Sequence, residues 1–232
     1  MLKLTEEAVG NFFEIPIGIS DDLVQELADG LEKVATFRLI FLDSNTAFCD
    51  SLYVGDVTNA KICPALRNLK KNLTFLAAIV TDRAQPLAVK EVMKASFEAF
   101  LMTLLAGGST RIFLKLDHEM ILEDFKSLKC VFCSYGEGLV AEEVVDKEAK
   151  IIEGVVELMG QPIDQLVEDF SIAACKASGM GMIGTGQKLP MPPTTGRWNR
   201  ADANTILRVL YYRNDIVANH FLKTTFQLAK RR

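Results

Sequence analysis

Three features of the sequence contain residue types and spacings that could support chemistry. The stretch GMGMIGTG, from Gly179 to Gly186, contains the G-x-G-x-x-G spacing of a dinucleotide-binding loop. Cys130 and Cys133 form a C-x-x-C pair, which occurs in redox sites and in zinc sites. His118 and His220 are the only histidines, the side chains best suited to proton transfer near neutral pH. Each of these candidates works only if the surrounding elements hold it in the required geometry.

The elements around the glycine-rich stretch do not suit a nucleotide. A dinucleotide loop follows a strand and opens a helix, so that the phosphate lies at the helix N-terminus. Here a helical pattern precedes the glycines, and prolines follow at positions 190, 192 and 193. Proline lacks a backbone N–H and favours extended backbone in the residue before it. We therefore interpret this region as a glycine- and proline-rich connector and expect no cofactor.

The cysteine pair and the histidines also have structural interpretations. Cys130 and Cys133 lie in a helical pattern without a second close pair, so we expect buried free thiols and no metal. His118 follows Asp117 at a helix start, where it is expected to take part in capping. His220 lies on a mostly apolar helical pattern and is expected to be partly buried. The sequence thus predicts no catalytic residues, and we expect a protein that is not an enzyme.

Composition excludes further classes of function. The formal net charge is -4 and the pI is about 5.4, whereas nucleic-acid-binding modules usually carry a basic excess. The longest apolar run, from Phe75 to Val80, is too short to span a bilayer. The N-terminal MLKLTEEAVG has two glutamates where a signal peptide would be apolar, so we expect a cytoplasmic protein with reduced cysteines.

The dominant hydrophobic period along the chain is helical. Apolar residues recur at this spacing from about residue 20 to 42 and again from Pro64 to Val80. Further helices are expected from Pro86 to Gly107, from Asp117 to Phe132, from Val145 to Gly160 and from Pro162 to Ala174. Two shorter helices are expected at residues 202–212 and 215–226. Expected buried positions include Met93, Phe97, Phe100, Leu101, Leu104, Phe125, Phe132, Phe170, Ile206, Val209, Leu210, Ile216, Val217 and Phe221.

These patterns predict an all-α fold, an elongated antiparallel helical bundle with a connector and a short C-terminal helical pair. Only Arg111 to Leu116 has some of the alternation of a strand, and no internal repeat is evident. We divide the chain into an N-terminal segment (1–33), a bundle (34–178), a Gly/Pro-rich loop (179–200) and C-terminal helices that pack on the bundle (201–232).

Two features are candidates for contact with partners. Trp198, the only tryptophan, is expected to anchor the connector on the bundle, with a proline-rich ligand for an aromatic groove as the alternative. The last ten residues contain Lys223, Lys230, Arg231 and Arg232 and no acid. These cations could attract anionic lipid, or they could simply complement the dipole at a helix C-terminus.

Several long stretches resemble the C-terminal region of plant Unc-13-like proteins. They include FRLIFLDSNTAFCDSLYVGDV, IVTDRAQPLAVKEVMKASFEAFLMTLLAGG, LVEDFSIAACKASG, KLPMPPTTGRWNRADANTILRVLYYRND and VANHFLKTTFQLAKRR, and together they cover about residues 34–232. The resemblance implies the second Munc homology region of a MUN-type module, related in architecture to tethering complexes. It also implies vesicle trafficking and exocytosis, including delivery of a proton pump to the plasma membrane, with SNARE-class proteins as partners. The expected location is therefore the cytoplasm, with peripheral contact at endosomal or plasma membrane.

The segment EIPIGISDDLVQELADGLE also resembles these proteins, but in them it lies well upstream of FRLIFLDS. We therefore expect an internal deletion at the joint near Glu32 and Lys33, and a shortened paralogue or an isolated domain. A missing neighbour would leave apolar helix faces uncovered and favour self-association. Two alternatives remain open: a regulatory or decoy fragment that occupies the partners of its full-length relatives, and a helical enzyme with a small-molecule cavity.

Overall fold

The computed structural model describes residues 48, 50–55, 57, 62–80, 82, 84–108, 110–134, 140–179, 189–196 and 198–226. The helices are α3 (Cys63–Ile79), α4 (Gln85–Ala106), α5 (Asp117–Ser134), α6 (Glu142–Gly160), α7 (Ile163–Ala177), α8 (Ala203–Tyr212) and α9 (Ile216–Phe226). No strand occurs in the described ranges, where an isolated parallel bridge joins Phe113 to Arg213. The all-α fold is therefore confirmed. The helix expected at 20–42 and the joint near Glu32 and Lys33 lie outside the described residues.

Proline and glycine set the boundaries of the first two described helices. Pro64 and Pro86 lie in the first turns of α3 and α4. Proline is tolerated there because backbone N–H groups in the first turn have no carbonyl partner within the helix. Gly107 follows the last residue of α4, as the sequence predicts. The Gln85 amide then joins the two helices, because it donates to the carbonyls of Ala77 and Val80 at 3.1 and 3.2 Å near the end of α3.

Aspartates begin both short C-terminal helices. The Asp202 carboxylate accepts a hydrogen bond from the Thr205 N–H at 2.9 Å and caps α8. The Asp215 carboxylate accepts from the N–H groups of Val217 and Ala218 at 2.7 and 3.2 Å, at the start of α9. These helices begin where the sequence predicts, because a side-chain oxygen satisfies amides that have no partner within the helix.

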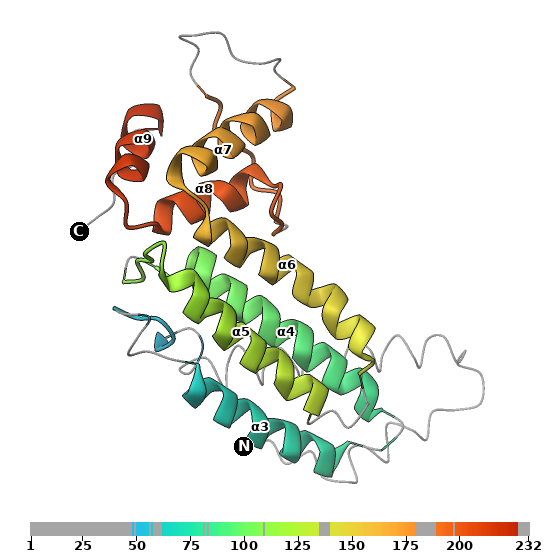
Figure 1. The fold of residues 1–232 in the computed structure, drawn as a ribbon. Coiled ribbons are helices and arrows are strands. Elements are labelled where there is room, and N and C mark those ends of the chain that lie inside the picture. The colour runs from blue at the N-terminus through green and yellow to red at the C-terminus, as the bar shows by residue number, and fades with distance from the viewer. Residues whose placement is uncertain are drawn as a thin grey trace.

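The long helices α3, α4, α5 and α6 alternate in direction, as expected for antiparallel neighbours (Figure 1). Helices α7, α8 and α9 gather at the end where α6 finishes, and α8 packs on α4, α6 and α7. The connection between α4 and α5 lies at this same end, beside the turn from α8 to α9. Segments distant in the sequence therefore meet at one end of the bundle.

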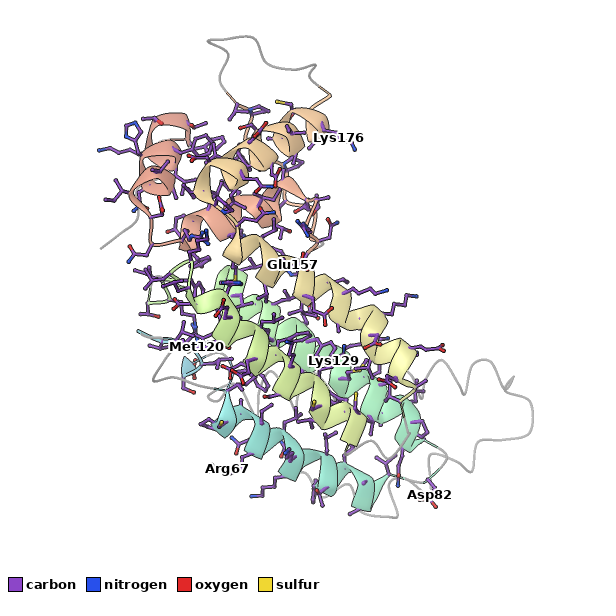
Figure 2. All side chains as sticks on the ribbon, viewed as in Figure 1. Arg67, Asp82, Met120, Lys129, Glu157 and Lys176 are labelled. Carbon is purple, nitrogen blue, oxygen red and sulfur yellow. The ribbon has the colours of Figure 1, made fainter. Side chains whose placement is uncertain are left out.

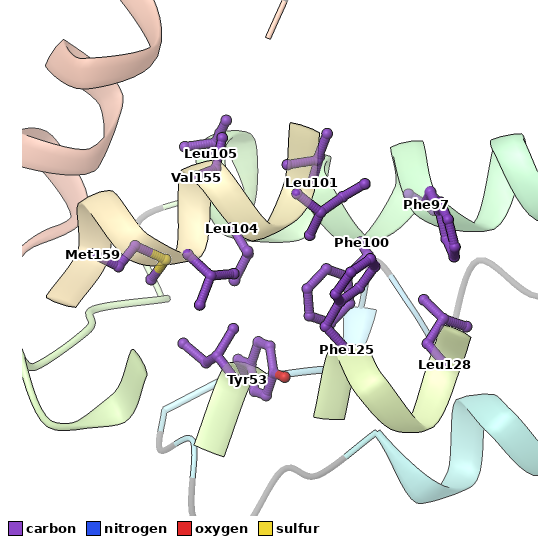
Figure 3. Close-up of a cluster of buried hydrophobic side chains, with 14 of the residues drawn as sticks. Tyr53, Phe97, Phe100, Leu101, Leu104, Leu105, Phe125, Leu128, Val155 and Met159 are labelled. Atoms are coloured by element: carbon purple, nitrogen blue, oxygen red, sulfur yellow. The ribbon is translucent and has the colours of Figure 1, made fainter. Parts of the chain in front are cut away.

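Aromatic side chains fill the centre of the bundle, and the apolar stripe predicted for α4 is buried there (Figure 3). The Phe97 ring meets the rings of Phe125 and Phe132 edge to face, with centroids 5.2 and 5.9 Å apart. Tyr53 packs edge to face on Phe100, with centroids 6.2 Å apart, and its hydroxyl donates to Asp124 Oδ2 at 2.8 Å. Burial and the Asp124 charge raise the pKa of Tyr53 far above its ordinary value, so the phenol stays neutral.

Buried arginines satisfy the carbonyls at the ends of two long helices. Arg111 Nε donates to the Leu52 carbonyl at 2.7 Å, and its guanidinium also binds the carbonyl of Gly107 after α4. Arg213 binds the carbonyls of Met159 and Gln161 at the end of α6, the latter at 2.6 Å. Burial lowers the pKa of Arg213 from its ordinary value, although a guanidinium stays charged at any ordinary pH. The arginines thus neutralise the negative ends of these helices and fix the segments beside them.

Lys129 on α5 joins this helix to α6 (Figure 2). Its ammonium lies 2.6 Å from Asp146 Oδ1 and 3.6 Å from Glu153 Oε1. The hydrogen bond to Asp146 raises the pKa of Lys129. All three side chains are partly exposed, so the cluster contributes little to stability.

The predicted burial is wrong for part of α9. Ile216 and Val217 are exposed, and His220, expected to be partly buried, is exposed as well. The helix packs on the core through Ala218 and Leu222, which lie one turn apart. At about 100° per residue, positions 216 and 220 point away from that face.

Burial is also predicted wrongly for the cysteine pair. Cys130 and Cys133 are free thiols in α5, as expected, but both are exposed. The buried stripe of α5 runs through Leu128 and Phe132, which leaves the two thiols beside it at the surface. Partial desolvation of its thiol, followed by the nearby Cys130, raises the pKa of Cys133, which disfavours the reactive thiolate.

Candidate interaction surfaces

An exposed apolar surface forms where the connection between α4 and α5 meets the start of α9. Residues 111–114 alternate, with Arg111 and Phe113 buried and Ile112 and Leu114 exposed. The Phe113 N–H donates to the Tyr212 carbonyl at 2.9 Å, and the Phe113 carbonyl accepts from the Asn214 N–H at 2.8 Å. This pairing holds the extended segment against the turn that leads into α9.

Leu116 and Ile216 are the most exposed large apolar side chains of the described residues, at 78% and 87%. The pairing of Phe113 with the 212–214 turn brings their segments side by side (Figure 1). We name the exposed apolar residues of these two segments the apolar corner. It consists of Ile112, Leu114, Leu116, Ile216 and Val217. Exposed apolar residues on two neighbouring segments are candidates for contact with another protein.

Polar contacts hold the apolar corner in place. The Leu114 N–H donates to Asp117 Oδ2 at 2.7 Å, and the Asp117 N–H donates to the Leu114 carbonyl at 3.2 Å. His118 Nδ1 lies 2.9 Å from the Lys115 carbonyl, in the capping region where the sequence places it. Its ring packs against Gly160 so closely that a Cβ there would lie 2.6 Å from His118 Cδ2. The corner is therefore preorganised, which lowers the entropic cost of binding.

The connector residue Trp198 is half-buried and packs against the core. The Arg208 guanidinium carbon lies 5.7 Å from the centre of its ring, and Arg208 also donates to the Leu105 carbonyl at 3.2 Å. Trp198 therefore contacts a side chain that is itself tied to the end of α4. Its role as the loop anchor stays a prediction.

Of the basic residues proposed for membrane contact, the structure describes one. Lys223 is exposed in the last turn of α9. Lys230, Arg231 and Arg232 lie outside the described residues, so the predicted basic surface stays untested.

Within the described ranges, the candidate reactive residues do not assemble. No group of three or more His, Cys, Asp or Glu side chains could hold a metal ion there. A small internal cavity is lined by the buried residues Leu104, Phe113, Met159, Val209, Tyr212 and Arg213. A more open pocket is lined by Pro86, Leu87, Lys90, Val140, Ala141 and Val144. Neither of these two sites brings His220 or the cysteine pair to a carboxylate, the arrangement that a helical enzyme would need. Of the G-x-G-x-x-G stretch, only Gly179 is described; it has a φ of +66° just after α7.

The described part of the chain is thus all-helical, built of antiparallel helices, with exposed apolar residues where the α4–α5 connection meets the start of α9. None of its helices is long and apolar enough to cross a membrane. The chain belongs to the PATROL1-like, TPR-repeat family, whose model matches residues 32–232.

A curated relative supports this assignment. The chain is 26% identical over 212 residues to a protein unc-13 homolog of Arabidopsis thaliana. The match covers 89% of this chain and 18% of that relative, so the chain spans less than a fifth of its length. No solved structure matches the chain.

The family description names repeats, although no internal repeat is evident in the sequence. The antiparallel pairs in the structure begin at Cys63, Asp117 and Ile163. The starts of successive pairs are unevenly spaced, and each pair is longer than the roughly 34 residues of a tetratricopeptide repeat, so no fixed period is visible in the sequence.

Proposed function

We propose that this protein is a non-enzymatic helical interaction module that acts in vesicle tethering or priming and in exocytosis to the plasma membrane. Its relative is an unc-13 homolog, and the long stretches from FRLIFLDS onward resemble plant Unc-13-like proteins of MUN type. SNARE-class fusion proteins are the proposed partners, with no cofactor and no nucleic acid required.

The apolar corner is the observation that carries this proposal. It exposes five large apolar side chains on a backbone that hydrogen bonds hold in place. Burying one Leu or Ile side chain contributes about 1.5–3 kcal/mol. A few residues usually supply most of the binding energy of a protein contact. Two or three of these side chains, buried at the centre of a contact, could fill that role.

A direct binding measurement tests the proposal. Purified plasma-membrane SNARE proteins would be titrated with the wild-type chain and with a Leu116→Asp/Ile216→Asp variant. Because both side chains are exposed, we expect the variant to keep the thermal stability of the wild type. We expect its affinity for the SNARE proteins to be lower by about tenfold or more, because at least one buried apolar contact is lost.

Ile172→Asp on α7 is a matched control, because Ile172 is also an exposed apolar residue but lies outside the corner. Equal binding by the wild type and the corner variant would contradict a role for the corner. An equal loss with Ile172→Asp would show a nonspecific effect of added charge. Sedimentation of the same proteins would show whether the corner instead joins two copies of this chain.

A regulatory fragment is the second candidate, because the chain spans only 18% of its relative. Such a fragment would occupy the same partner without joining two membranes. Adding it to the full-length relative and the partner would then displace the relative, whereas a cooperating module would leave the relative bound.

A further inference from the structure

Helix α3 presents a basic face with an exposed aromatic residue. Ala65, Leu69 and Leu73 are buried and pack α3 on the core. Arg67 and Lys71 lie one turn apart, about 200° around the helix from Ala65 and Leu69, and both are exposed. Figure 2 shows Arg67 on the outer side of α3, at the edge of the bundle.

Phe75 continues this face one turn further along α3 and is 64% exposed. Ala78, in the next turn, is exposed as well. We name the surface of Arg67, Lys71 and Phe75 the α3 face. It is basic in its first half and apolar in its second.

The charge of the α3 face is not neutralised within its own helix. The 17 residues of α3 contain Arg67, Lys70 and Lys71 and no Asp or Glu. No ion pair joins Arg67 or Lys71 to a carboxylate in the part of the chain that the structure describes. The neighbouring α5 has exposed Glu119 and Glu123, but neither forms an ion pair with Arg67 or Lys71.

At the far end of α3, Asp82 accepts a hydrogen bond from Gln85 Nε2 at 3.2 Å. This acid is thereby held at the connection to α4. The two cations at the start of the α3 face remain available to an external anion.

We propose that the α3 face docks on an anionic membrane surface, with Arg67 and Lys71 at the lipid headgroups and Phe75 inserted at the boundary with the acyl chains. A cation near an anionic bilayer contributes roughly a fivefold gain in affinity. An aromatic ring beside cations on one helix face is typical of residues at the membrane interface. This lipid contact goes beyond the proposed function and does not use the apolar corner, so the two can fail separately.

Flotation of the full chain with vesicles tests the inference. The probes are vesicles of phosphatidylcholine alone and of an equimolar mixture with phosphatidylserine, each at low and high salt. We expect flotation only with the anionic vesicles and a loss at high salt, because salt screens charges at a surface. Failure of the wild-type chain to float with anionic vesicles would overturn the inference.

Charge-reversal variants locate the contact. Arg67→Glu/Lys71→Glu should lower the fraction bound to anionic vesicles by roughly tenfold or more. Lys147→Glu/Lys150→Glu on α6 changes the net charge equally at exposed positions and should keep most of the binding. An equal loss in both variants would mean that net charge, not the α3 face, controls binding, and would overturn the inference.

Two further measurements separate other sources of binding. Lys230→Glu/Arg231→Glu/Arg232→Glu should retain vesicle binding; if this variant alone loses it, the tail and not α3 holds the membrane. Binding of wild type to polyglutamate but not to anionic vesicles would favour an acidic protein partner and overturn the lipid contact.

The fluorescence of a tryptophan at position 75 tests insertion of this side chain. The tryptophan emission of Phe75→Trp should shift to the blue on anionic vesicles, beyond any shift from Trp198 in wild type. Emission that does not shift would contradict burial of position 75 in the bilayer.

Discussion

The buried hydrogen bond between Tyr53 and Asp124 makes a quantitative prediction for Tyr53→Phe. The substitution keeps the ring, with its edge-to-face contacts to Phe100 and Phe113, and removes only the hydroxyl that donates to Asp124 at 2.8 Å. A hydrogen bond to a charged group contributes about 1.5–3 kcal/mol. We therefore expect Tyr53→Phe to lower the free energy of unfolding at neutral pH by about 1.5–3 kcal/mol, measured by urea denaturation.

The same variant should also change the response to alkaline pH. The pKa of Tyr53 is raised in the folded state by burial and by Asp124, so the unfolded chain releases the phenol proton first as pH rises. The stability that Tyr53 contributes is thus complete below pH 10.0, its ordinary pKa, and is lost above it. The loss is up to about 1.4 kcal/mol per pH unit and should be absent in Tyr53→Phe. Equal stability at neutral pH, or an equal alkaline slope in both proteins, would refute this reasoning.

Two predictions concern the core and the surface of the bundle. Phe97→Ala should lower the free energy of unfolding by about 3–5 kcal/mol in urea, because the Phe97 ring is buried against Phe125 and Phe132. Phe75→Ala is its control and should change stability by about 0.5 kcal/mol or less, and similar values for the two would contradict the assigned burial. Lys129→Ala should lower the free energy of unfolding by about 1 kcal/mol or less, because its ion pairs with Asp146 and Glu153 are partly exposed. High salt should reduce this difference in stability between Lys129→Ala and the wild type. Because the pKa of Lys129 is raised in the folded state, the difference should disappear at alkaline pH, where the ammonium loses its proton. A difference that responds to neither salt nor pH would contradict an ionic origin.

The helices could be predicted from the sequence because their signals are local. Pro86 and Gly107 mark the two ends of α4, and the spacing of Phe97, Phe100 and Leu104 fixes which side of that helix is buried. Asp202 marks the start of α8 for the same local reason, since its carboxylate caps an amide three residues away.

The candidate surfaces could not be predicted, because they depend on which side of a helix meets a distant segment. Ile216 looks like a core residue by hydrophobicity, and only the packing of α9 through Ala218 and Leu222 leaves it exposed. The alternation from Arg111 to Leu116 was the available signal for one half of the apolar corner. It indicates two faces, but not that Phe113 would pair with the turn after α8.

The α3 face had a weaker signal still. Arg67 and Lys71 do not stand out, because the chain is negative overall. The more evident group of basic residues in the sequence lies at its C-terminal end. The absence of any acid from α3 was visible in the sequence, but the exposure of Phe75 depends on the position of the helix at the edge of the bundle.

The most direct test of the central claim measures the delivery of a secreted membrane cargo in cells that normally produce this protein. Deleting its gene should lower the amount of cargo at the cell surface. The wild-type chain should restore that amount, and the Leu116→Asp/Ile216→Asp variant should not. Unchanged delivery after deletion would contradict a role in exocytosis, and increased delivery would contradict a cooperating module and favour the regulatory fragment.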